Sequence, residues 1–139
     1  MKIEKIHLQI LLPVLSMLKI QSCEISTNCF GEHVIISDDF KLGYISMDDF
    51  GNFKGHIEGI TFSTRKDHWG KLNIFIDGKQ IHYQEDDCGS CVVSLEFHHI
   101  FFKKNAFGQY CGYMNRKNFI LKKDDFGHDK IEIYDSFLT

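Results

Sequence analysis

Apolar and polar residues alternate through short runs along most of this chain, which is the pattern of half-buried β-strands. The clearest instance is residues 72–83, where the dipeptide Asp77-Gly78 separates two alternating runs. A type I′ turn at this dipeptide places Ile74 opposite Ile81, so that both strands present their apolar side chains on one face. The pattern therefore predicts an antiparallel hairpin.

Similar short runs follow one another, separated by clusters of Asp, Asn and Gly that favour turns. We predict further strands at residues 33–37, 41–47, 53–63, 91–102, 109–115, 118–122 and 130–134. In the run 91–102 we expect one buried face, formed by Val93, Leu95, Phe97 and Phe101. About nine locally connected strands indicate an all-β fold, an antiparallel meander that forms a β-sandwich or a small barrel.

The tripeptide Asp-Asp-Phe occurs at residues 38–40, 48–50 and 124–126. Its spacing is irregular, so we interpret it as one turn used several times and not as a structural repeat of fixed period. Calcium binding by these acidic turns is the weaker interpretation, because their carboxylates lack the alternating pattern of a calcium loop.

The first 22 residues differ in composition from residues 23–139, which we expect to form a single β domain. Two basic residues, Lys2 and Lys5, precede an apolar run that ends shortly before Cys23. One interpretation is a bacterial lipoprotein signal, with Cys23 as the lipidated residue and membrane tether. The other is an N-terminal helix, which Pro13 would break or kink. The first interpretation predicts a protein of the cell envelope or a secreted protein, and the second a cytoplasmic one.

The composition is that of a globular protein, with 43% apolar and 25% charged residues in 139. Thirteen Phe against one Pro favour strands over helices. The formal charge is −3, and the 16 basic residues form no continuous stripe. We therefore do not expect a nucleic-acid partner.

Five cysteines leave one without a partner in any disulfide scheme. If Cys23 carries lipid, Cys29, Cys88, Cys91 and Cys111 make an even set, and an exported protein would join them in two disulfides. Free thiols are the second interpretation. A zinc site using Cys88, Cys91, His98 and Cys111 is the third, although adjacent His98 and His99 point to opposite faces of a strand.

No motif for nucleophilic catalysis and no phosphate-binding glycine loop occurs in the sequence. We therefore expect a non-enzymatic protein without a cofactor, which acts through contacts with another protein and whose narrowest version is an envelope-anchored inhibitor or immunity-type protein. The residues expected to anchor a partner are His68, Trp69, Phe50, Phe107 and Phe126. The alternatives are a β-barrel carrier of a small apolar ligand and a zinc or thiol protein using Cys88 and Cys91.

Overall fold

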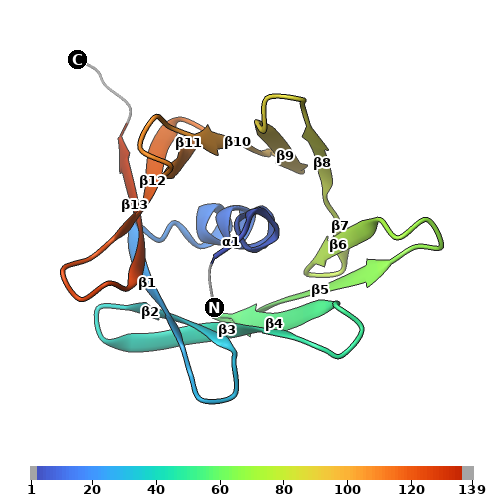
Figure 1. Ribbon diagram of the computed structural model, residues 1–139, viewed down its shortest axis with the longest axis horizontal. Helices are drawn as coiled ribbons and strands as arrows, with labels where there is room; N and C mark the ends of the chain where they lie inside the picture. Colours follow the sequence, from blue (N-terminus) through green and yellow to red (C-terminus); the bar gives the residue numbers. More distant parts are fainter. Residues whose placement is uncertain (1–2, 136–139) are drawn as a thin grey trace.

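An antiparallel sheet wraps around one helix in this molecule (Figure 1). The computed structural model describes residues 3–135. The helix is α1 (Lys5–Leu18). The strands are β1 (Ser22–Thr27), β2 (His33–Ser37), β3 (Phe40–Met47), β4 (Phe53–Ile57), β5 (Ile60–Lys66), β6 (Leu72–Ile76), β7 (Lys79–Gln80), β8 (His82–Glu85), β9 (Cys91–Leu95), β10 (His98–Lys104), β11 (Tyr110–Met114), β12 (Lys117–Lys123) and β13 (Asp129–Asp135).

The sheet nearly closes into a barrel. Its strand order is β7-β6-β5-β4-β3-β2-β1-β13-β12-β11-β10-β9-β8, and every neighbouring pair is antiparallel. The two edge strands, β7 and β8, follow each other in the chain on either side of Ile81, so the edges meet where the sheet would close. There the Ile81 N–H donates to the Ile74 carbonyl at 2.9 Å. The all-β prediction is confirmed, but thirteen strands replace the expected nine.

The predicted hairpin at Asp77-Gly78 is confirmed. Asp77 and Gly78 have φ values of 54° and 80°, and Ile76 lies opposite Lys79. Both values are positive, as a type I′ turn requires. The buried side chains of Ile74 and Ile81 share the inner face, in the predicted register.

Two of the predicted strands are in fact hairpins. Residues 53–63 turn at Glu58-Gly59, and residues 91–102 turn at Glu96-Phe97. Val93 and Leu95 are buried as expected, but Phe97 sits in the turn and is 87% exposed. The alternation across Glu96 looked continuous because this two-residue turn carries no glycine.

The hairpin connections are of two alternating kinds, which makes the fold a repeat. Six five-residue loops span residues 28–32, 48–52, 67–71, 86–90, 105–109 and 124–128, and successive loops begin 19 or 20 residues apart. Two-residue turns lie between them, and the first residue of each has a φ of 49° to 58°. The interpretation of Asp-Asp-Phe as one turn used several times is correct for residues 48–50 and 124–126, which open equivalent five-residue loops. It is wrong for residues 38–40, because Asp38 and Asp39 form a two-residue turn and Phe40 begins β3.

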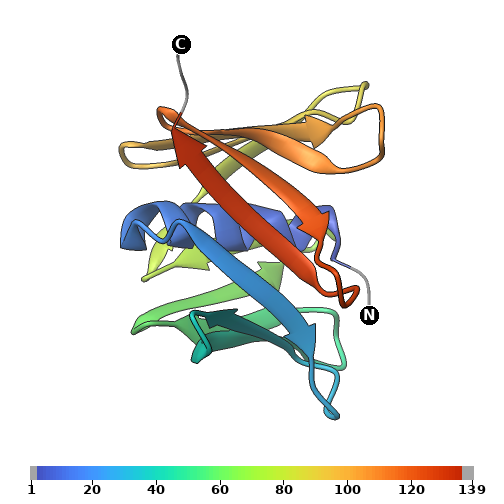
Figure 2. The same ribbon diagram turned by 90° about the vertical axis from the view of Figure 1, so that its left-hand side faces the viewer.

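Helix α1 occupies the inside of the sheet (Figure 2). Its apolar residues cover every side, and six of them have no exposed surface: Leu8, Ile10, Leu11, Leu12, Val14 and Leu15. A helix that is apolar all round requires burial on all sides. Its 14 residues span about 21 Å, which matches strands of five to seven residues at roughly 17–23 Å. The helix continues through Pro13, where a break or kink was expected.

Cys23 lies in β1 with its side chain buried in the core. Burial raises the pKa of its thiol to about 12. Lipid attachment at Cys23 after removal of residues 1–22 stays a prediction, and it would take α1 out of the core. No helix within residues 3–135 has the length and apolar character needed to cross a bilayer.

Candidate binding surface

The six five-residue loops share one hydrogen-bonding pattern. In the loop 48–52, the Asp48 Oδ1 accepts from the backbone N–H of Phe50 at 2.8 Å and of Asn52 at 2.9 Å. An Asn or Asp at the first position makes the same two bonds in the other five loops. The fourth residue is always glycine, with φ between 78° and 85°, a conformation that other residues rarely adopt.

An aromatic side chain projects from the third position of five of these loops. The side chains are 80% to 87% exposed and belong to Phe30, Phe50, Trp69, Phe107 and Phe126. In the sixth loop the position holds Cys88, whose N–H donates to Asp86 at 2.9 Å in the same way. The turn thus uses only the backbone of this residue, and the fold supplies no reason for an aromatic side chain.

All six loops lie at one end of the barrel, and we call this end the long-loop rim. Neighbouring strands run in opposite directions, and β7 and β8 together make a single pass along the barrel, so the two kinds of connection fall at opposite ends. The N-terminal end of α1 lies at the long-loop rim, where the Lys5 Nζ is 3.2 Å from the Glu85 Oε2 just before the loop 86–90. Figure 1 shows the loops spread around the helix.

The long-loop rim is also strongly acidic. Its six loops hold eight carboxylates and one lysine, a formal charge of −7, whereas the whole chain carries −3. The rest of the chain is therefore net positive. Lys66, Lys104 and Lys123 directly precede three of the loops and offset part of this negative charge.

The structure places the predicted anchors at the same end of the barrel. Phe50, Trp69, Phe107 and Phe126 occupy the same position of different loops, and the His68 ring lies 4.8 Å from the Trp69 ring. The sequence analysis missed Phe30, because no strand was predicted before residue 33 and the loop between β1 and β2 was therefore not recognised. The pattern Asx-x-x-Gly at 28, 48, 67, 86, 105 and 124 would have identified it.

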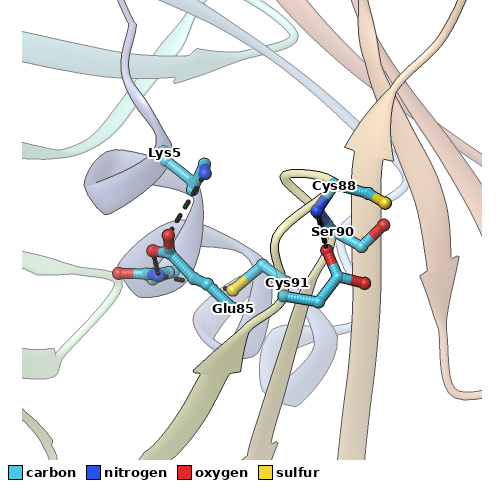
Figure 3. Close-up of polar contacts among 7 residues, drawn as sticks. Lys5, Glu85, Cys88, Ser90 and Cys91 are labelled. Atoms are coloured by element: carbon cyan, nitrogen blue, oxygen red, sulfur yellow. Dashed lines mark hydrogen bonds and ion pairs between the residues drawn. The ribbon is translucent and has the colours of Figure 1, made fainter.

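The cysteines form no disulfide, so the two predicted bridges are absent and all five thiols are free. Cys88 and Cys91 diverge, as Figure 3 shows: Cys88 lies on the loop, whereas Cys91 is buried behind it. The Gln9 amide of α1 donates to the Cys91 Sγ and to the Glu85 Oε1, at 3.3 and 3.2 Å. Burial raises the pKa of the Cys91 thiol, which disfavours the reactive thiolate.

The residues weighed for zinc are not brought together either. His98 lies at the opposite end of the barrel, with its Nδ1 2.9 Å from the Ser16 Oγ. The Cys91 side chain faces the core, whereas Cys111 lies on the outer face of β11. Among residues 3–135, the group that brings three ligand atoms within 4.8 Å is Glu24, Asp124 and His128. The Asp124 carboxylate already accepts the loop's two N–H bonds, which lower its pKa.

Under the long-loop rim, two histidines are buried inside the barrel. The His7 ring of α1 and the His33 ring of β2 have centroids 4.5 Å apart. The His7 Nδ1 accepts from the Glu4 N–H at 2.9 Å, but the Nε2 atoms of both rings have no partner within the described residues. Burial, and then the charge of His33, lower the pKa of His7 to about 4.

No protein-family model, curated protein or solved structure matches the chain.

Proposed function

We propose that this protein is a non-enzymatic binding protein that holds another protein on its long-loop rim. The observation that carries the proposal is the exposure of five aromatic side chains at equivalent loop positions. Aromatic side chains contribute much of the binding energy at protein interfaces. Exposing them to water is unfavourable for the free protein, so their repeated presence at one end supports an interface.

The partner surface is basic. Eight carboxylates lie in the same six loops as the aromatic rings. A cationic partner would contact both groups favourably, because carboxylates attract Lys and Arg while ring faces attract the same cations. The narrower version, an envelope-anchored inhibitor or immunity-type protein directed at a basic toxin, agrees with this charge. It also needs export, and export by lipoprotein processing of residues 1–22 would remove α1 from the core, which counts against this version.

The carrier alternative loses support from the position of α1. A barrel that carries a small apolar ligand needs space in its interior, and the side chains of α1 fill the interior between the strands. The zinc or thiol alternative loses support from the separation of Cys88, Cys91, His98 and Cys111.

The test is to recover a stoichiometric partner with the intact chain and then to measure its Kd against rim variants. We expect the triple substitution Phe50→Ser, Trp69→Ser and Phe126→Ser to weaken binding at least 100-fold. A buried interface aromatic contributes roughly 2 kcal/mol, or about 30-fold. Binding by the unsubstituted protein should also weaken as salt is raised, because exposed charge pairs are screened.

The matched control is the double substitution Phe40→Ser and Phe97→Ser. These aromatic side chains are 75% and 87% exposed, but they lie at the opposite end of the barrel. The control variant should bind with unchanged Kd. A partner whose affinity is unchanged in the triple variant, or falls equally in both variants, would contradict the proposal.

A further inference from the structure

A second concave site lies at the opposite end of the barrel from the long-loop rim. It is a cavity of about 490 Å³ between the C-terminal end of α1 and the hairpin formed by β11 and β12. Its apolar wall is made by Leu15, Ile20, Met114 and Ile133. This volume falls within the usual range for small-molecule sites, roughly 300–1,000 Å³.

The polar lining of this cavity is cationic. Lys19, Arg116 and Lys117 line it, and no carboxylate does. Within residues 3–135, none of the three cations makes an ion pair. They are therefore available to an anionic group from outside.

Nearby negative charge does not cancel these cations. Glu96, on the turn between β9 and β10, forms an ion pair with Lys79. Asp135 lies across from Lys117 in the β12–β13 ladder and offsets one cation. The C-terminal end of α1 adds a partial charge of roughly −0.5, and its Leu15 and Ser16 carbonyls accept from the N–H groups of Ile20 and Lys19. The net charge at the mouth of the cavity therefore remains positive.

A small hydrogen-bonded cluster holds the cavity in shape. The Ser16 Oγ lies 2.9 Å from the His98 Nδ1 and accepts from the Asn115 amide at 3.3 Å. The Asn115 Oδ1 in turn accepts from the His99 N–H at 2.8 Å. These bonds join α1, β10 and the β11–β12 turn, so the turn that carries Arg116 is fixed relative to the helix.

We propose that this cavity binds a single-chain anionic amphiphile, such as a long-chain carboxylate. The alkyl chain would lie against Ile20, Met114 and Ile133, and the anionic group would contact Lys19, Arg116 and Lys117. The cavity lies at the end of the barrel core, with Leu15, Met114 and Ile133 belonging to both. It is at the opposite end from the long-loop rim, so this inference stands independently of the proposed function.

The test is titration calorimetry of the full chain with three probes below their aggregation concentrations. We expect dodecanoate to bind with one-to-one stoichiometry, and butyrate and the dodecyltrimethylammonium cation to bind at least tenfold more weakly. Butyrate tests the need for the alkyl chain, and the ammonium compound tests the sign of the head group. Equal affinity for the two C12 probes would overturn the proposal.

Paired variants test the location of the site. The double substitution Arg116→Gln and Lys117→Gln should weaken dodecanoate binding about tenfold, whereas Lys41→Gln and Lys103→Gln, at exposed strand positions, should leave it unchanged. Unchanged affinity in the first variant would place the ligand elsewhere and overturn the assignment. Phosphatidylglycerol vesicles distinguish a free amphiphile from a lipid surface: binding to vesicles without binding to free dodecanoate would likewise overturn a single-chain site.

Discussion

Replacing Leu11 with alanine is expected to lower the free energy of unfolding by roughly 3–5 kcal/mol. Leu11 lies in the middle of α1, inside the barrel, and has no exposed surface. Its truncation removes apolar contacts and leaves a cavity that the surrounding strands cannot move in to fill. Because a domain of this size has a total stability of about 5–15 kcal/mol, the variant should unfold at a clearly lower urea concentration by circular dichroism.

The control is Met17→Ala in the same helix. Met17 is half-buried and packs at the edge of the core, so its truncation should cost about 1–2 kcal/mol. Both substitutions introduce alanine and raise helix propensity, so the difference between them reports burial within the barrel. Equal losses in the two variants would mean that α1 does not occupy the interior.

The second large effect is a loss of stability as the pH falls below 6.5, through His7. Burial lowers the pKa of His7 from 6.5 to about 4, so the unfolded chain binds a proton that the folded chain excludes. The stabilisation is complete above pH 6.5 and is lost progressively down to about pH 4. The expected loss at pH 5 is about 2 kcal/mol for this group. His33 adds in the same direction, because burial lowers its pKa as well.

The substitution His7→Asn separates this effect from other acid-sensitive groups. The asparagine oxygen replaces the Nδ1 acceptor for the Glu4 N–H but cannot take up the proton. The free energy of unfolding of this variant, measured by urea titration from pH 7 to pH 5, should depend less on pH than that of the unsubstituted protein. The control His56→Asn, at an exposed position of β4, should keep the original dependence. Parallel curves for the unsubstituted protein and His7→Asn would refute the role of His7.

The local features of the fold could be predicted from the sequence, whereas the number of hairpins could not. The turn at Asp77-Gly78 has two residues that favour positive φ, which makes it easy to recognise. The turn at Glu96-Phe97 has neither Gly nor Asn, so residues 91–102 looked like one strand. The six equivalent five-residue loops lie at one end of the barrel and recur every 19 or 20 residues. The chain must therefore reverse once between successive loops, and Glu96-Phe97 is the reversal between the loops 86–90 and 105–109.

The position of α1 depends on the whole barrel and could not be read from its own residues. An apolar segment after two lysines fits a signal sequence and a buried helix equally well, because both require burial away from water. What distinguishes the buried helix is the ring of inward residues on the strands, which exists only once the barrel is formed. Some of the rim aromatics, by contrast, could be predicted from their neighbouring residues alone. Trp69 and Phe50 lie in polar loops, where no strand buries them.

The most direct test of the central claim, that the long-loop rim serves binding and not folding, is the melting temperature of one variant. In that variant Phe30, Phe50, Trp69, Phe107 and Phe126 are all replaced by serine. We expect a melting temperature within about 10 °C of the unsubstituted protein, because exposed substitutions usually change stability by less than about 0.5 kcal/mol each, or about 2.5 kcal/mol for all five. If these rings were part of the core, each would contribute about 3–5 kcal/mol, and a variant that is unfolded at room temperature would contradict the claim.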